Sequence, residues 1–382
     1  MQSIYFDQAA TVPVRSEVLA EFVRVSREYA ANPSSLHALG LAAAKTIAAA
    51  KESLAQALGC RAEELIFTSG ATEAVNTALS GYHNSRYRDS NEIIYSAGDH
   101  SATLQTVKHL ESVGRVGIDI GLTATGHPDL VRLEATLSPQ TLMITLLAVN
   151  NETGAITDLA AVARLRNLKA PQAAIHIDYT QAPGKIEINL RDGHCDLASF
   201  SGHKFGALKG SGLLFCRDSI NLRPLIFGGG QQRNMRSGTE SPAMAAQLAL
   251  AMNLALEERE ETYERVAALR TLLLEELSEI EFILNSSPPA VPHIVNIAFP
   301  GILGQTLASA LSAEGIMVAT ASACGASSPV SHVLSAMGQD KAEAQSAIRI
   351  SLAENHTEAE VCTLAAAVRK NVALLRSIGG KK

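Results

Sequence analysis

The sequence predicts an α/β protein, with a large, mostly parallel β-sheet covered by helices on both faces and a smaller α/β domain after it. Two observations predict this architecture. Short apolar runs alternate with longer stretches in which apolar residues recur at helical spacing, as in strands joined by crossover helices. From about residue 241 the pattern changes to one long helical stretch, and new strand-like runs follow it. A chain of 382 residues is long enough for such an arrangement.

Six short apolar runs are the expected strands of the large sheet, because they have strand length and lie between turn-forming residues. They span 65–67, 93–95, 142–147, 174–177, 197–200 and 212–215. The clearest strand-like runs of the smaller domain are 294–298 and 346–351. Between the two sets, we expect a helical stretch from Met244 to about Leu277 that leads from one domain into the other.

The composition is that of an ordinary globular protein and argues against several functional classes. Apolar residues make up 47% of the chain, charged residues 18%, and the net charge is −6, so we expect no basic face for direct nucleic-acid binding. No apolar run reaches the roughly 18 residues of a membrane-spanning helix, and the first residues do not form a secretory signal. The five cysteines are widely spaced, which argues against a disulfide framework or a metal site. We therefore expect a cytoplasmic protein with free thiols.

Polar and ionisable residues follow five of the expected strands. The five clusters are 69–73, 99–100, 150–152, 178–181 and 201–204. In an open α/β sheet, ligands bind outside the carboxyl ends of the strands, so these clusters should converge on one site. Five clusters in register are hard to explain by loop composition alone.

Lys204 is the strongest single candidate for chemistry. Its amine, directly after a strand, can form a Schiff base with an aldehyde cofactor, and the neighbouring Ser201 and His203 can bind a phosphate. Asp178 ends the preceding strand, and a carboxylate there can pair with a protonated pyridine nitrogen and keep the ring an electron sink. The alternatives are a solvated lysine and an aspartate that caps a helix.

Three further positions offer contacts to a phosphate, a ring and a carboxylate. Segment 69–73 turns into a helical pattern, so backbone N–H groups and the Thr72 hydroxyl can hold a phosphate, although plain helix capping is an alternative. The His100 imidazole can stack on a cofactor ring and move protons near neutral pH, or it can be structural. Arg349 lies inside an apolar strand and needs an anion, which is either a protein carboxylate or that of an amino-acid substrate.

Cys324 lies in the segment 320–328, whose many Ala, Ser and Gly residues are typical of a loop. A thiol in such a loop is exposed enough to ionise and react. The other four cysteines lie nearer apolar runs and are expected to be packing residues: Cys60, Cys195, Cys216 and Cys362.

Taken together, these segments resemble the cysteine desulfurases, a family in the class V group of fold-type I pyridoxal-phosphate (PLP) enzymes. The resemblance runs from Tyr5 to about Leu375. It implies a large PLP-binding domain over 16–250, with a mostly parallel seven-stranded-type sheet. It also implies a small α/β domain made of 1–15 and 251–382, which carries the cysteine loop. The most specific segments are 32–37, 68–73, 149–154, 176–181, 199–204, 228–230 and 235–239.

The resemblance implies a role for each catalytic candidate. Lys204 matches the Schiff-base lysine, His100 the histidine stacked on the ring, and Cys324 the nucleophile that accepts sulfur. The implied cofactor-binding residues are Lys204, Ala71, Thr72, His100, Asp178, Gln181, Ser201, His203 and Thr239.

The resemblance also implies substrate contacts and a partner subunit. Asn151, Arg349 and Asn32 match substrate-binding positions, with Arg349 on the substrate carboxylate. Thr239 matches a threonine that reaches the phosphate from the other subunit, so a homodimer with shared sites is implied.

The implied reaction converts L-cysteine to L-alanine, with the sulfur held on Cys324 as a persulfide and then passed to an acceptor protein. A selenocysteine lyase or another class V PLP enzyme is the alternative, and a binding protein on the same fold is a rival from another class. The sequence departs from housekeeping members in a slightly shorter loop after Cys324 and in an end soon after residue 380. Those members continue with a tail that helps dock an iron–sulfur scaffold, so the acceptor, the pathway (iron–sulfur assembly or thio-modification) and the sulfur-to-selenium preference stay open.

Overall fold

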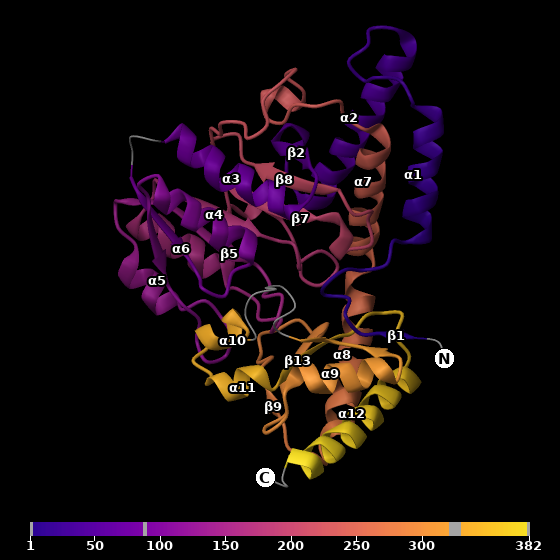
Figure 1. The fold of residues 1–382 in the computed structure, drawn as a ribbon. Helices are drawn as coiled ribbons and strands as arrows, with labels where there is room; N and C mark the ends of the chain where they lie inside the picture. The colour runs from indigo at the N-terminus through magenta and orange to yellow at the C-terminus, as the bar shows by residue number, and fades with distance from the viewer. Residues whose placement is uncertain (1–2, 87–89, 321–329, 380–382) are drawn as a thin grey trace.

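The computed structural model describes residues 3–86, 90–320 and 330–379 (Figure 1). A large α/β unit occupies the upper part of the view, and a smaller one, built mainly from the C-terminal part of the chain, lies below it. This arrangement confirms the predicted α/β class with a large mostly parallel sheet.

The large sheet has seven strands in the order β2-β8-β7-β6-β5-β3-β4. The pairs from β7 through β6, β5 and β3 to β4 are parallel, whereas β8 runs antiparallel to both β7 and β2. All six predicted strands are present, and β4 is an additional edge strand. The bounds are β2 Leu65–Thr68, β3 Glu92–Tyr95, β4 Val116–Asp119, β5 Thr141–Leu147, β6 Ala174–Asp178, β7 Leu197–Ser201 and β8 Gly212–Cys216.

Helices cover both faces of this sheet because its strands are apolar on both sides. Successive strand residues alternate between two cores: Ile94 and Ile144 pack on one face, and Ile93 and Met143 on the other. The first face is covered by α2 (Ala38–Leu58), α5 (Leu130–Thr136), α6 (Leu159–Lys169) and α7 (Pro242–Glu257), with α1 (Ser16–Glu28) packed on α7. The second face is covered by α3 (Ala71–Ser85) and α4 (Ser101–Ser112).

The smaller unit has its own sheet and its own core. Its antiparallel sheet has the order β12-β13-β10-β9, and β1 pairs in parallel with β11. The core around Phe6 and Phe299 is closed by the helices α8, α9 and α12. The bounds are β1 Ile4–Tyr5, α8 Arg259–Leu277, β9 Ile283–Leu284, β10 Ile294–Ala298, α9 Gly304–Ala313, β11 Ile316–Met317, β12 Ala319–Thr320, α10 His332–Ala336, α11 Lys341–Gln345, β13 Ala347–Ser351 and α12 Glu358–Gly379.

The predicted helical stretch from Met244 to Leu277 is two helices, α7 and α8, which meet at Glu258. Helix α7 packs on the large unit as far as Ala255, so the division at residue 250 falls inside this helix. Helix α8 turns its buried residues, Val266 among them, into the second core. The change of core, rather than any loss of helical pattern, separates the two helices.

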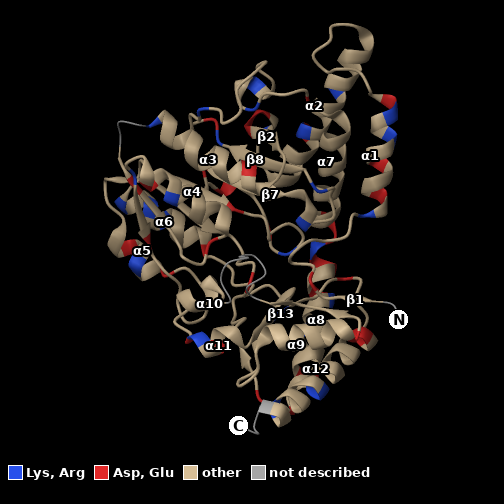
Figure 2. Cartoon of the chain, in the orientation of Figure 1, with Lys and Arg blue, Asp and Glu red and all other residues tan. Residues whose placement is uncertain are grey.

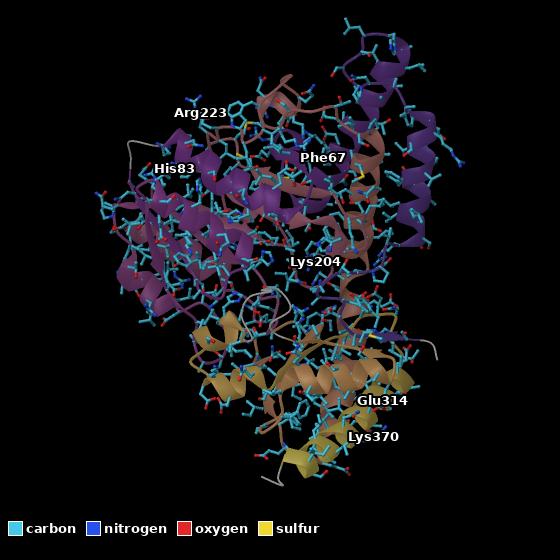
Figure 3. The ribbon with its side chains drawn as sticks, viewed as in Figure 1. Phe67, His83, Lys204, Arg223, Glu314 and Lys370 are labelled. Atoms are coloured by element: carbon cyan, nitrogen blue, oxygen red, sulfur yellow. The ribbon has the colours of Figure 1, made fainter. Side chains whose placement is uncertain are left out.

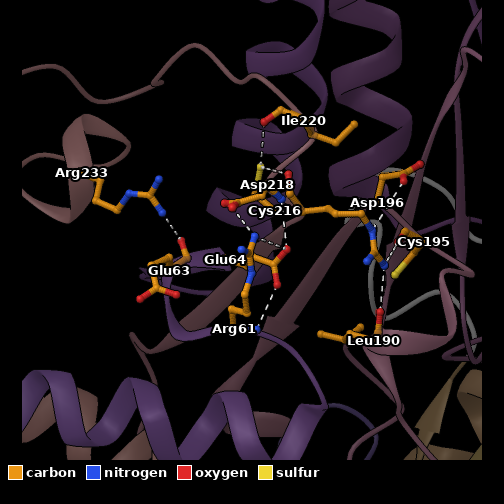
Figure 4. Close-up of polar contacts among 11 residues, drawn as sticks. Arg61, Glu63, Glu64, Leu190, Cys195, Asp196, Cys216, Asp218, Ile220 and Arg233 are labelled. Atoms are coloured by element: carbon orange, nitrogen blue, oxygen red, sulfur yellow. Dashed lines mark hydrogen bonds and ion pairs between the residues drawn. The ribbon is translucent and has the colours of Figure 1, made fainter.

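A polar network surrounds two of the cysteines where β8 ends and β7 begins (Figure 4). Arg217 donates to the Leu190 and Cys195 carbonyl oxygens, both at 2.8 Å, and the Cys216 thiol lies 3.7 Å from the Ile220 carbonyl oxygen. Burial raises the pKa of both thiols to about 12, so at neutral pH they stay protonated. The structure thus agrees with a packing role for Cys195 and Cys216.

Acidic and basic residues are interspersed over the elements rather than gathered by sign (Figure 2). Along α1, for example, Arg24 forms ion pairs with Glu21 and Glu28. Among the described residues, no helix has the length and apolar character needed to cross a membrane.

Candidate active site

The five strand-end clusters meet in one cavity of about 640 Å³ at the carboxyl edge of the large sheet. Residues from all five line it, together with the N-terminal segment 9–11 and Arg349 from β13 of the smaller unit. The cavity therefore lies where the two units meet, and Lys204 is seen at that level in Figure 3. The prediction that these clusters converge is confirmed by this geometry, as expected for the carboxyl ends of an open α/β sheet.

Lys204 ends a single turn of 3-10 helix, Gly202–Lys204, that directly follows β7. Its Nζ donates to the carbonyl oxygens of Ala9 (2.6 Å) and Ala10 (2.8 Å). Two backbone carbonyls thus hold the amine at the cavity wall, on the side of the N-terminal segment.

Asp178 ends β6 and His100 follows β3, two strands with β5 between them, and both residues line the same cavity. Asp178 is buried, and its Oδ1 accepts from the Thr180 N–H at 2.9 Å. His100 caps α4, and its Nδ1 accepts from the Ala102 N–H at 3.1 Å, so its proton sits on Nε2. Burial, with the charge of Lys204, lowers the pKa of His100, which favours the neutral imidazole.

A set of small and hydroxyl-bearing residues forms a cradle at the start of α3. Gly70, with φ 155°, turns the chain from β2 into the helix, and a side chain on the adjacent Gly212 would meet the Gly70 backbone at 2.5 Å. Ala71 and Thr72 follow on the helix, and Ser201 faces them across the cavity wall; all line the cavity. A helix N-terminus with free N–H groups is a natural site for a phosphate.

His203 lines the cavity beside this cradle. Its Nδ1 lies 3.1 Å from Thr11 Oγ1, and burial lowers the pKa of His203 to about 4. Neutral at physiological pH, this imidazole offers a hydrogen bond rather than a charge to a neighbouring anion.

Arg349 is held by protein groups on two sides. Its Nη2 pairs with Asp7 Oδ1 at 2.8 Å, and its Nη1 donates to the Asn151 carbonyl oxygen at 2.9 Å. Its buried Nε has no partner. Both Arg349 and Asn151 line the cavity. The sequence left the anion open, and the structure shows that Asp7 supplies it.

Two predicted residues do not line this cavity in the single chain, and a third cannot be placed. Asn32 is exposed in a turn, and its Oδ1 accepts from the Ser34 N–H at 2.9 Å. Thr239 is exposed and lines a separate cavity of about 150 Å³. Cys324 lies outside the described residues.

The chain after residue 329 is tied to the site by two contacts that the sequence did not indicate. The Ser331 hydroxyl donates to Glu152 Oε2 at 2.6 Å, and His332 Nε2 lies 3.1 Å from the Asp99 carbonyl oxygen. Glu152 is buried, and burial raises the pKa of its carboxyl group. These contacts bring α10 against the strand ends that line the cavity.

Comparisons with known proteins agree with this geometry. The sequence model of the family described as Aminotransferase class-V matches residues 4–364. A putative cysteine desulfurase, IscS 1 of Bacillus subtilis, is 34% identical over 96% of this chain and 97% of its own length. The chain belongs to the cysteine desulfurase family.

The fold of this chain is also similar to solved structures of related proteins. A NifS-like protein superposes with a TM-score of 0.92 at 34% identity, covering 98% of this chain and 100% of that one. A structure titled SspA in complex with cysteine superposes with a TM-score of 0.81 at 31% identity, covering 92% of this chain and 99% of that one.

Cysteine desulfurases depend on PLP, which is therefore the cofactor of this chain. The cavity fits that group. Two buried polar atoms that line it, Thr180 Oγ1 and Gln181 Oε1, have no hydrogen-bond partner, as expected where a polar ligand is to be received. Among the described residues, no group of three or more His, Cys, Asp or Glu side chains could hold a metal ion.

Proposed function

We propose that this PLP-dependent cysteine desulfurase converts L-cysteine to L-alanine, holds the sulfur on Cys324 as a persulfide and passes it to an acceptor. The observation that carries the proposal is the convergence of Lys204, Asp178, the α3 cradle and Arg349 on one cavity. An amine, a ring-nitrogen partner, a phosphate site and a carboxylate site are what an amino-acid substrate and this cofactor require.

When bound, PLP supplies an aldehyde that condenses with amines and a ring that withdraws electrons from the substrate's α-carbon. Lys204 would hold it covalently, and Asp178 would pair with its ring nitrogen. His100 would lie against the ring and Gln181 would meet the ring hydroxyl. The phosphate ligands would be Ala71, Thr72, Ser201 and His203, with Thr239 added from a neighbouring subunit.

The substrate carboxylate would bind at Arg349. Asp7 and the Asn151 carbonyl hold two of the guanidinium nitrogens, which leaves the unpartnered Nε as an available donor. An arginine held in this way binds a planar carboxylate more selectively than a mobile arginine does. The Asn151 side chain would bind the substrate beside Arg349. We extend this substrate role to Asn32, which could contribute only from a neighbouring subunit or after a change in its turn.

Protons would be carried by Lys204 and His100. His100 Nδ1 is occupied by the Ala102 N–H, so Nε2 is the atom that would exchange protons. The lowered pKa of His100 leaves this imidazole neutral at pH 7, with Nε2–H as the donor that it can offer to the substrate.

The sulfur step would use the Cys324 thiolate. As its S–S bond to the substrate sulfur forms, the substrate's Cβ–S bond breaks, and the electron pair left on Cβ takes up a proton to give alanine. Among the other cysteines, burial raises the thiol pKa of Cys60, Cys195 and Cys216 to about 12 and suits them poorly to this attack. A reducing, cytoplasmic setting is part of the proposal, since Cys324 must return to a thiol after each transfer.

A homodimer with shared sites is also part of the proposal. Thr239 is exposed on its own subunit, and large apolar side chains that a monomer has little reason to expose occur near the start of α2 and before the 228–239 segment. Their exposed fractions are Leu36 90%, Leu39 67%, Leu41 56% and Phe227 80%. A two-fold interface over these surfaces would bring each Thr239 toward the partner's phosphate site.

The alternative is a selenocysteine lyase or another class V PLP enzyme. Such an enzyme can share Lys204, Asp178 and the cradle, but expels the chalcogen without an enzyme thiol. Dependence of alanine release on Cys324 therefore separates the two functions.

The cofactor assignment is tested at Lys204. The purified protein should absorb visible light, and borohydride should fix the cofactor to the peptide that contains Lys204, because an imine is reduced to a stable amine. Lys204→Ala should lose the reducible chromophore, measured by absorbance and by peptide mass. Lys209→Ala, a lysine that lines the same cavity, is the matched control and should keep it. A reducible chromophore that survives in Lys204→Ala would show the assignment to be wrong.

A further inference from the structure

A second cavity, of about 240 Å³, shares Ala9 and Lys204 with the catalytic cavity but is not lined by Arg349. Its lining includes the N-terminal segment around Ala9, the turn after β6 that contains Lys185, and the segments at the start of β10 and the end of β13 in the smaller unit. The cavity therefore sits between the two units of the fold. It is smaller than the roughly 300 Å³ typical of sites for drug-sized ligands, so a small molecule would fill it.

Two buried polar side chains that line this cavity lack hydrogen-bond partners. His293 is 5% exposed, and neither of its ring nitrogens has a partner. Ser351 is 1% exposed, and its Oγ has none. Leaving such groups unpaired costs free energy, so buried polar atoms nearly always meet a partner. The catalytic proposal uses neither residue.

The same wall holds Lys185, which forms no ion pair with any described residue, although the charge of Glu354, also in the lining, acts to raise the pKa of this lysine. Among the described residues, Lys185 Nζ forms no hydrogen bond or ion pair. The other charged groups in the lining are engaged elsewhere. Arg15 pairs with Glu258 at 2.7 Å and with Glu354 at 3.8 Å, and Lys204 donates to the Ala9 and Ala10 carbonyls.

The electrostatics of this wall favour a negative ligand. Desolvation, with the nearby charge of Lys204, lowers the pKa of Lys185 to about 8. Burial and the charge of Lys185 lower the pKa of His293 to about 3, so this imidazole is neutral at pH 7. An anion in the cavity would pair with the ammonium of Lys185, which has no ion-pair partner among the described residues.

We propose that this interdomain cavity binds a small organic carboxylate, with Lys185, His293 and Ser351 as its donors. A carboxylate has about four acceptor positions on two oxygens, enough for an ammonium, a ring N–H and a hydroxyl. Part of the remaining lining is apolar, including Val12, Pro13, Leu352 and Ala353, and suits a short aliphatic chain, whereas Gln8, Thr262 and Asn355 make another part polar. The proposal goes beyond the desulfurase reaction and does not depend on it.

A ligand at this place would bridge the two units. Lys185 belongs to the large unit, whereas His293 and Ser351 flank strands of the smaller one. The ligand would also lie beside Ala9, whose carbonyl accepts from Lys204. Binding should therefore stabilise one relative position of the units.

Butyrate is the probe, and the holoenzyme is titrated by calorimetry. Wild type should bind it, and Lys185→Met should weaken binding at least about ten-fold, because a charge-assisted hydrogen bond is lost. His293→Phe should also weaken butyrate binding, because it removes the ring N–H donor and leaves Lys185 in place. Lys108→Met, an exposed lysine on α4, is the matched control and should bind as wild type does.

Two further arms separate this cavity from other carboxylate and anion sites. Arg349→Lys should retain butyrate binding, since that arginine lies in the other cavity; binding lost in Arg349→Lys but kept in Lys185→Met would overturn the proposal. Sulfate should bind more weakly than butyrate, and equal binding would overturn the carboxylate assignment.

The acetylation rate of Lys185 in unmutated holoenzyme tests the proposal even if a variant does not fold. A bound carboxylate should raise the pKa of Lys185 toward its ordinary value, so butyrate should slow its acetylation at pH 8. Lys108 labelling, followed in the same peptide digest, should not change. An unchanged labelling rate at Lys185 would contradict the proposal.

Discussion

At the scale of single residues, Arg349 shows how the site combines a buried charge with an available donor. Asp7 neutralises the guanidinium, and the Asn151 carbonyl accepts a second hydrogen bond. A buried arginine is tolerated only with such partners. Its Nε–H still lacks a hydrogen-bond acceptor, and the substrate carboxylate would supply one.

Replacing Arg349 by lysine should raise the KM for L-cysteine about ten- to hundred-fold, with a smaller effect on kcat. Lysine keeps the charge but loses the planar fork, which removes roughly one charge-assisted hydrogen bond. Steady-state alanine production measures both constants. Arg369→Lys, which alters an ion pair with Glu276 away from the cavity, is the control and should behave as wild type does. An unchanged KM in Arg349→Lys would remove the arginine from the substrate site.

Residues at strand ends could be predicted because sheet geometry alone brings them together. Lys204, Asp178 and His100 each follow a recognisable apolar run, and all three line one cavity. Asp7 could not be assigned as the partner of Arg349, because the two are 342 positions apart and only tertiary packing joins them. The same reason hid the Glu152–Ser331 contact, which spans 179 positions.

At the scale of elements, the long apolar strands were visible in the sequence and the short or exposed ones were not. Strand β5 is buried along its whole length, so its residues form a continuous apolar run. In β4 the first residue, Val116, is 46% exposed, and the strand holds only one parallel neighbour. Strands β1 and β11 have two residues each and exist only because they pair with one another.

The segment between β8 and α7 is the element on which the dimer proposal rests. Phe227→Glu should disfavour dimerisation, because it places a charge in the apolar surface that the partner would cover. The expected outcome is a shift toward monomer in sedimentation velocity, with loss of activity and weaker retention of PLP. Val131→Glu, at a residue on α5 that is 79% exposed, is the control and should remain dimeric.

A wild-type protein that sediments as a monomer at assay concentration and is fully active would count against shared sites. Retention of dimer and activity in Phe227→Glu would place the interface elsewhere.

At the scale of the whole molecule, two separate cores stand on either side of the site. The larger core supports the strand ends that carry Lys204 and Asp178, and the smaller core, built around Phe6 and Phe299, supports Arg349. Groups that must hold a ring still are thus placed on rigid strands. In the proposed reaction the segment with Cys324 has a different task, since its thiol would meet the substrate and then an acceptor.

This division of tasks is the central claim, and Cys324→Ser tests it most directly. The variant should still bind PLP and still change its absorbance when L-cysteine is added, because neither event uses the thiol. It should lose persulfide formation and nearly all alanine release, since a hydroxyl is a poor nucleophile toward sulfur. Cys362→Ser is the matched control and should release alanine at the wild-type rate. The measurement is alanine production recorded beside the absorbance change. Near-normal alanine release by Cys324→Ser would contradict the account and favour a lyase that expels the chalcogen without an enzyme thiol.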